Sequence, residues 1–308
     1  MDGSTLVSSS PELPFVAAPP GSIESVTRSA EAAAAHWQFA RPELLRMGMN
    51  AIFTAGHGVL LRVATPTAPA QQAIWLAHHL TQLGLRVPNY LHDEPFVTDE
   101  HAVFANTRVV EHGPADWHAV GEMIARLHRV ERKDVADGFP VPFCGDFPWW
   151  DFATLLGDVG AELDARARHS IESAIERDLP LLNDQRQALS VVCHGDVHPG
   201  NVIQAEVGPV LLDWDLVCRG PAAWDHAPLM TWTQRWGGDS GIYEAFAGGY
   251  GLSLRGDPLA EAIAELRLVA ATLMRVRAGR VNATAAAEAN LRLRYWRGER
   301  DAPQWNAQ

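Results

Sequence analysis

Two short apolar segments, each followed by polar turn-forming residues, constrain this chain more than any other feature. Val191–Cys193 runs into His194-Gly195-Asp196, and residues 210–212 run into Asp213. Both segments have the length and apolar content of buried strands. Side chains at the ends of neighbouring strands can converge, so the sequence predicts that Asp196 and Asp213 lie close together.

The order and spacing of three polar residues around these segments indicate a particular chemistry. Kinases use an Asp that accepts the proton of an alcohol, an Asn five positions later, and a second Asp at the end of a nearby strand. Asp196, Asn201 and Asp213 follow that order. Asn and Asp oxygens are hard ligands that suit Mg²⁺. The sequence therefore predicts phosphoryl transfer, with Asp196 as the catalytic base and Asn201 and Asp213 as metal ligands.

The same residues also have structural interpretations that involve no catalysis. Gly, Pro, Asn and Asp form turns, so either segment alone could be an ordinary connection between strands; three matched positions in the right context favour the site. His194 and His198 could be metal ligands, but a structural site needs two further ligands with suitable spacing. Cys193 and Cys218 lack that spacing. Both histidines are therefore interpreted as supports of the loop.

The region around these motifs resembles the aminoglycoside phosphotransferase and choline-kinase-like family, relatives of the protein kinases, and the resemblance covers most of the chain. It implies the same roles for the three polar residues and implies that His194 props the catalytic loop. The later Gly220-Pro221-Ala222-Ala223-Trp224-Asp225 is similar to the family's stretch after the metal-binding Asp. The resemblance implies that Asp225 braces the loop. An acid stabilising a helix N-terminus would fit equally well, and the two roles are compatible.

By this resemblance the chain has a two-lobed α+β fold of the protein-kinase type, with a small N-terminal lobe built on an antiparallel sheet and a larger, mainly helical C-terminal lobe. We expect a flexible leader over residues 1–22, a nucleotide-binding lobe over 23–112, and a catalytic and substrate lobe over 113–308. Apolar patterns and turn residues predict short strands over 44–47, 51–54, 59–63 and 102–110, with helices over 70–83 and 119–130.

The nucleotide site is predicted from weaker signals. Gly48-Met49-Asn50 resembles the family's nucleotide loop, although a single Gly in a strand more often marks a bulge or turn. Arg62 interrupts an apolar strand, as does the cation that pairs with nucleotide phosphates in kinases, and a guanidinium binds phosphate with two nitrogens. Backbone groups of Val110 and Glu111 are expected to hold the base of ATP, or of GTP or another nucleoside triphosphate.

One position departs from the kinase pattern. Protein kinases pair the strand cation with a Glu on the following helix. The helix predicted over residues 70–83 carries Gln71 and Gln72 near that place and contains no acid. The sequence leaves two possibilities open: a neutral hydrogen bond to Arg62, or a partner from elsewhere in the chain.

The acceptor side is less defined. Aromatic residues gather at 147–150 and 232–236, and aromatic faces beside carboxylates would suit a cationic or sugar-like ligand. Tryptophans are also common core residues because each buries a large apolar area. The candidates for acceptor binding are Asp151, Asp215, Trp232 and Trp236, with Asp239 and Glu244 as further acids.

Composition limits the partners. The 308 residues include 37 acidic and 25 basic side chains, a formal net charge of −12. That charge argues against nucleic-acid binding and mildly favours a cationic acceptor. Three cysteines cannot form a disulfide framework, so we expect reduced thiols in a cytoplasmic protein. No apolar run reaches membrane-spanning length, and so no membrane association is expected. A monomer and a homodimer are both compatible.

The resulting hypothesis is a small-molecule kinase that uses Mg²⁺ and a nucleoside triphosphate to phosphorylate a hydroxyl by direct in-line transfer. The acceptor classes are aminoglycoside-type antibiotics, amino alcohols and sugars. A protein substrate is not expected, because no Ala-Pro-Glu activation segment follows Asp213. Two alternatives stay open: a catalytically silent nucleotide- or ligand-binding member of the same fold, and a metal-dependent phosphohydrolase that releases phosphate without an acceptor.

Overall fold

Alternating apolar residues in the first third of the chain form a five-stranded antiparallel sheet. The computed structural model describes residues 19–65 and 70–306. The strands are β1 Glu43–Met47, β2 Ala51–Thr54, β3 Val59–Ala64, β4 Phe96–Val97 and β5 Ala102–Thr107. They pair in the order β1-β2-β3-β5-β4, which leaves β1 and β4 as the edges.

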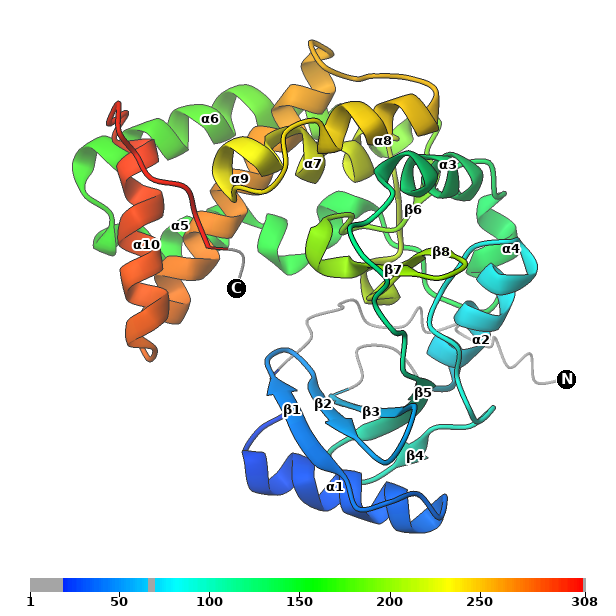
Figure 1. Cartoon of the computed structure of the whole chain (residues 1–308). Helices are drawn as coiled ribbons and strands as arrows, with labels where there is room; N and C mark the ends of the chain where they lie inside the picture. The colour runs from blue at the N-terminus through cyan, green and yellow to red at the C-terminus, as the bar shows by residue number, and fades with distance from the viewer. Residues whose placement is uncertain (1–18, 66–69, 307–308) are drawn as a thin grey trace, which may run out of the picture.

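The two faces of this sheet have different partners because strand side chains alternate between faces. Phe53, Leu61 and Val103 point to one face, where they pack against helix α1, Ile23–His36. Figure 1 shows α1 below the sheet and the rest of the molecule above it. Residues of the opposite face, including Leu60 and Arg62, line a cavity between the sheet and the larger lobe.

Helix α2, Ala70–Gln82, packs against both parts of the molecule. Its Ile74 contacts the sheet in a small cluster with Phe104. Leu76 and Leu80, on another face of the helix, belong to the core of the larger lobe. The helix therefore connects the two hydrophobic cores.

Helices dominate the larger lobe (Figure 1). They are α3 Trp117–Leu127, α4 Arg132–Ala136, α5 Phe152–Val159, α6 Ala165–Asn183, α7 Ala223–Arg235, α8 Ile242–Tyr250, α9 Pro258–Gly279 and α10 Ala283–Trp296. Helix α9 packs against α6, α7 and α10. Two short antiparallel pairs complete the lobe: β6 Val191–Cys193 with β9 Cys218–Gly220, and β7 Val202–Ala205 with β8 Gly208–Leu211.

The predicted α+β class, with a sheet-based small lobe and a helical large lobe, is confirmed. The strand predicted over 102–110 ends earlier, at Thr107, and the helix predicted over 119–130 is α3, which begins at Trp117 after its N-cap Asp116. Most of the expected leader, residues 1–18, lies outside the described residues. Ser22 caps α1, accepting a hydrogen bond from Ser25 N. Within the described residues, no helix is both long and apolar enough to cross a membrane.

Candidate active site

The loop after β6 and the segment after β8 are held together by His194. Its Nδ1 accepts a hydrogen bond from Asp196 N at 3.2 Å, and its Nε2 donates to Leu212 O at 2.8 Å. The side chain is buried, and burial lowers the pKa of His194, which keeps the ring neutral and able to both donate and accept. His194 thereby fixes the backbone of Asp196 relative to that of Asp213.

Asp225, in the first turn of α7, also holds the loop after β6. Its carboxylate accepts hydrogen bonds from His194 N and Gly195 N, each at 2.8 Å, and pairs with His128 Nε2 at 3.1 Å. Burial opposes charge on both partners, but their mutual attraction raises the pKa of His128 to about 9 and lowers that of Asp225. Cys193 lies beside the pair, with the three possible ligand atoms within 4.8 Å of one another. Because His128 and Asp225 bond to each other, we interpret the group as a brace.

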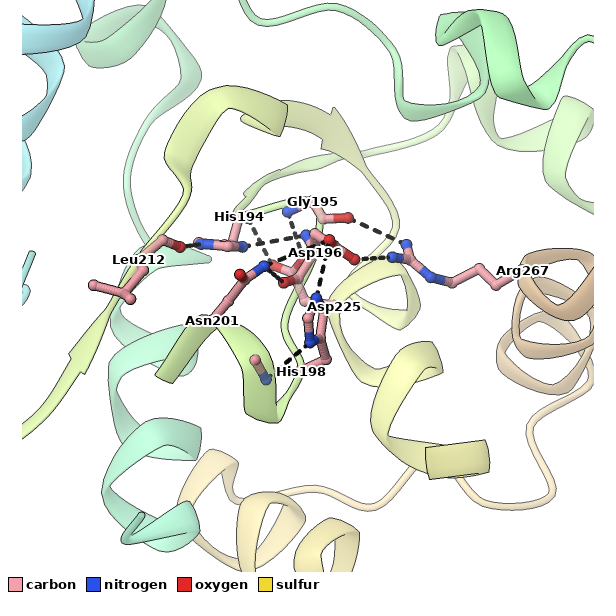
Figure 2. A network of polar contacts seen from close by, with 9 residues as sticks. His194, Gly195, Asp196, His198, Asn201, Leu212, Asp225 and Arg267 are labelled. Atoms are coloured by element: carbon pink, nitrogen blue, oxygen red, sulfur yellow. Dashed lines mark hydrogen bonds and ion pairs between the residues drawn. The ribbon is translucent and has the colours of Figure 1, made fainter. Parts of the chain in front are cut away.

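Asp196 is surrounded by donors (Figure 2). Arg267 Nη2 lies 2.6 Å from its Oδ1, while His198 Nε2 lies 3.3 Å from its Oδ2. Asn201 Nδ2 donates to Asp196 O at 3.0 Å and approaches Oδ2 at 3.5 Å. Burial alone would raise the pKa of Asp196, but His198 and Arg267 outweigh that effect and hold it below its usual range. The carboxylate is therefore ionised and able to accept a hydrogen bond from a hydroxyl.

Asp213 differs from Asp196 in lacking partners. Its backbone adopts the left-handed conformation at φ 58°, which is uncommon for a residue other than glycine and recurs at functional sites. Among the described contacts, the side chain takes part in no hydrogen bond or ion pair. Asp213 remains accessible to solvent, but the surrounding protein and the neighbouring charge of Asp215 raise its pKa to about 6. A carboxylate in this position is stabilised by any cation that comes to rest beside it.

Arg62 finds its partner in Asp215. Nη1 lies 2.9 Å from Oδ2 and Nη2 lies 3.3 Å from Oδ1. The guanidinium also stacks over Phe104. Burial works against its charge, yet Asp215 outweighs this and raises the pKa of Arg62 above its usual range. Gln71, by contrast, donates to the carbonyl of Asp93. Of the two possibilities that the sequence left open, the structure shows the partner from elsewhere in the chain.

A cavity of about 410 Å³ separates the sheet from these loops. Five of the predicted site residues line it: Asn50 and Arg62 from the small lobe, and Asn201, Asp213 and Asp215 from the larger lobe. Its walls are otherwise largely apolar, with Ile52, Leu60, Leu76, Ala77, Val109 and Phe139 among the lining residues. The cavity thus combines a limited number of polar groups with largely apolar walls, as small-molecule sites usually do.

The other predicted nucleotide residues lie in different places. Asn50 lines the cavity, whereas Gly48 stands in the turn before it, with Gly48 N donating to Asn50 O. Residues 108–112 form the linker between β5 and the larger lobe. In this linker Val110 is largely exposed, and Val109 lines the cavity. Glu111 is also exposed.

The acceptor candidates are similarly dispersed. Trp232 stacks on His198 with 5.1 Å between ring centroids and a 7° interplanar angle, and Trp236 stacks on Trp232 at 5.3 Å. Because His198 also contacts Asp196, these stacked rings lie on the same side of the loop as the Asp196 carboxylate. Asp151 caps α5, accepting hydrogen bonds from Thr154 N and Oγ1, and Asp215 is engaged by Arg62.

Sequence reasoning missed Arg267 and the pairing of Arg62 with Asp215. Arg267 lies 71 residues from Asp196 in the chain and belongs to no recognisable motif. The Asp215 pairing did leave a signal, because an acid two residues after Asp213 coincided with the absence of an acid on α2. Combining those two facts could have identified the partner.

Comparison with known proteins agrees with the fold. A model described as the phosphotransferase enzyme family matches residues 52–266, more than half of the chain. A search of curated proteins finds no match. A choline/ethanolamine kinase family protein from Mesorhizobium loti superposes with a TM-score of 0.64 at 17% identity, covering 89% of this chain and 94% of its own.

Two antibiotic-modifying enzymes are also similar in structure. Spectinomycin phosphotransferase, in complex with ADP and spectinomycin, gives a TM-score of 0.62 at 13% identity, with 85% of this chain and 90% of that chain covered. Aminoglycoside 2'-phosphotransferase-IIIa, in complex with GDP, gives 0.62 at 13%, with 88% and 97% covered. At these identities the likeness shows the fold, which is the two-lobed kinase-like fold predicted from the sequence.

Proposed function

This chain belongs to the phosphotransferase enzyme family, and from that premise we propose that it transfers the γ-phosphoryl group of a nucleoside triphosphate to a hydroxyl of a small molecule. The observation that carries the proposal is the placement of Arg62, Asn201 and Asp213 around one cavity, with Asp196 hydrogen-bonded to Asn201. Phosphoryl transfer needs positioning and charge stabilisation more than covalent chemistry, and this set supplies both.

Asn201 and Asp213 fit a divalent cation. Asn201 directs its Nδ2 to Asp196 O, which leaves its Oδ1 without a donor among the described contacts, and the Asp213 carboxylate is also free. Both are hard oxygen ligands of the kind that Mg²⁺ takes together with phosphate oxygens and water. When bound, Mg²⁺ would neutralise charge that develops on the phosphate oxygens.

Asp196 orients the acceptor and takes its proton. Its Oδ1 is occupied by Arg267, so the more weakly bonded Oδ2 is the oxygen available to the acceptor hydroxyl. The acceptor oxygen forms its bond to the γ-phosphorus as the bond to the bridging oxygen breaks, and the nucleoside diphosphate leaves with that electron pair. Arg62, fixed by Asp215, presents its remaining N–H groups to the phosphates. No covalent phospho-enzyme is formed.

The triphosphate would be ATP, with GTP as the other candidate. The apolar walls of the cavity suit either purine, and the solved relatives hold ADP in one case and GDP in the other. We propose that Asn50 and the backbone of the linker that includes Val109, Val110 and Glu111 contact the nucleotide. The linker is held at its end, because His112 N donates to Gln204 O of β7 in the larger lobe.

For the acceptor, we propose a ring-containing alcohol whose apolar face packs beside the stacked rings of Trp232 and Trp236. The contacts of the candidate acids support this proposal: Asp151 caps a helix, Asp215 pairs with Arg62, and Glu244 pairs with Arg255. Among these described candidates, Asp239 keeps a carboxylate without a side-chain partner, whereas Trp232 and Trp236 present stacked aromatic rings beside His198. Sugar rings and singly charged amino alcohols suit such a surface.

We also propose a cytoplasmic enzyme that acts as a monomer or homodimer. All three cysteines are free and buried in the structure, in keeping with a reducing compartment.

The test is nucleotide turnover with ATP and GTP across aminoglycosides, macrolides, amino alcohols and sugars, with and without Mg²⁺. The proposal expects diphosphate release that needs both an acceptor and Mg²⁺ and that is lost in Asp196→Asn. Phosphate release without any acceptor would instead establish a phosphohydrolase. Nucleotide binding without turnover across the whole panel would favour the catalytically silent alternative.

A further inference from the structure

Arg267 reaches the catalytic loop from helix α9. Its Nη2 lies 2.6 Å from Asp196 Oδ1, and its Nη1 donates to Gly195 O at 3.2 Å. One guanidinium therefore holds both the carboxylate of Asp196 and the backbone just before it, as Figure 2 shows. Only 16% of the Arg267 side chain is exposed, so water competes weakly for these contacts.

The orientation of this guanidinium is itself fixed. Its Cζ lies 5.4 Å from the ring centroid of Trp224, which is almost fully buried. The neighbours of Arg267 on α9, Leu266 and Leu268, belong to the core of the larger lobe. A planar cation held over an aromatic ring and anchored in a packed helix has little freedom to turn.

The other side-chain contacts of Asp196 come from its own loop. His198 and Asn201 approach Oδ2 at 3.3 and 3.5 Å, distances that are long for charge-assisted hydrogen bonds. Without Arg267, the carboxylate could rotate about χ2 and exchange its two oxygens. The contact from α9 is thus the one that distinguishes Oδ1 from Oδ2.

We propose that Arg267 is a positioning residue for phosphoryl transfer: it occupies Oδ1 of Asp196 so that Oδ2 faces the acceptor hydroxyl. The inference rests on the proposed function, in which Oδ2 receives the hydroxyl proton as the acceptor oxygen bonds to phosphorus. Arg267 contacts neither the proton nor the phosphate, and its effect is on the geometry of the base.

The test compares Arg267→Met and Arg267→Lys with Arg277→Met. Arg277 lies on the same helix but is exposed, and it pairs with Asp158. We expect Arg267→Met to lower kcat by roughly 10- to 100-fold, with the KM for the nucleotide changed by less than about twofold, because nucleotide contacts are untouched. Arg267→Lys should retain more kcat than the Met variant, and Arg277→Met should behave as the wild type.

Two results would overturn the proposal. One is a kcat for Arg267→Met within about twofold of the wild type. The other is a loss of kcat in both Arg267 variants that matches their loss of folded protein by circular dichroism, which would mark a purely structural role.

A readout independent of turnover separates this inference from the function it rests on. Hydrogen exchange of the peptide spanning residues 194–201 should be faster in Arg267→Met than in the wild type and unchanged in Arg277→Met. Unchanged exchange in Arg267→Met would show that Arg267 does not hold the loop. A wild type with no acceptor-dependent turnover but with this exchange pattern would contradict the proposed function alone, and leave Arg267 as a residue that holds Asp196.

Discussion

Arg62 on β3 and Asp215 after β8 form a two-point ion pair across the cleft between the lobes, with Nη1 2.9 Å from Oδ2 and Nη2 3.3 Å from Oδ1. The two side chains are 18% and 24% exposed, so the pair is partly shielded from solvent. It links the sheet of the small lobe to the segment that begins with Asp213. Arg62, the proposed phosphate-binding cation, and Asp213, the proposed metal ligand, are therefore held in one arrangement.

Removing the carboxylate charge of Asp215 should weaken both nucleotide binding and folding. In Asp215→Asn, Arg62 loses its ionic partner, and we expect the nucleotide KM to rise roughly tenfold and the free energy of unfolding to fall by about 2 kcal/mol. Steady-state kinetics and urea unfolding measure the two effects. The matched control is Glu31→Gln, which breaks the exposed pair with Arg41. An unchanged nucleotide KM in Asp215→Asn would contradict the role given to this pair.

Trp232 should contribute to acceptor binding and not to nucleotide binding. Removing the indole in Trp232→Ala takes away the ring that stacks on His198, and we expect the acceptor KM to rise by roughly 10-fold. Trp37→Ala is a matched control, because Trp37 also stacks on a histidine, His92, but in the small lobe. Equal acceptor KM values in the two variants would argue that Trp232 serves only to pack the lobe.

Gly195→Ala should disrupt the catalytic loop itself. Gly195 has a φ of 98°, and an added Cβ would lie 2.1 Å from Leu216 O. Gly251 has a φ of 91° with open space around it, so Gly251→Ala measures the backbone strain alone, about 1–2 kcal/mol. We expect Gly195→Ala to lower the unfolding free energy by more than that and to abolish turnover. A destabilisation equal to that of Gly251→Ala, with turnover retained, would show that the loop adapts to a side chain.

The brace between His128 and Asp225 predicts a pH dependence of stability. Burial opposes the charge of His128, but the hydrogen bond to Asp225 outweighs it, and the pKa of His128 rises to about 9 in the folded state, while an unfolded histidine titrates near 6.5. Between these values the folded protein holds a proton that the unfolded chain has lost. The stability from this pair is complete below about pH 6.5 and is lost as pH rises through about 9.

The slope of that loss is at most about 1.4 kcal/mol per pH unit. Urea unfolding of the wild type and of His128→Gln between pH 6 and 10 measures it, and the difference in stability between the two should shrink as pH rises. His118→Gln, at an exposed position on the same helix, controls for the loss of a histidine. A difference that stays constant over this range would mean that His128 is neutral in the folded state.

The sequence predicted best those parts of the candidate site that are formed by residues adjacent in the chain. The strands ending before Asp196 and Asp213 were predictable because their apolar runs are short and bounded by turn residues. The backbone of the loop after β6 follows from local chemistry as well, since Gly195 is needed for a positive φ.

Contacts between distant segments were beyond such reasoning. Arg267 on α9 contacts Asp196 in the catalytic loop. The apolar pattern of a helix predicts its buried face but not which loop that helix will contact. Arg292 is likewise buried in α10, where it donates to Ala271 O on α9 and to Asn306 O near the end of the chain. Both depend on packing between segments, which composition and periodicity do not encode.

The most direct test of the central claim is the stoichiometry of the reaction, measured by ³¹P NMR with Mg²⁺, the nucleoside triphosphate and the acceptor that supports fastest turnover. We expect one phosphate ester on the acceptor for each nucleoside diphosphate formed, and neither product with Asp196→Asn or Asp213→Asn. Diphosphate accompanied by inorganic phosphate in place of the ester, or ester formation that persists in Asp196→Asn, would contradict the account.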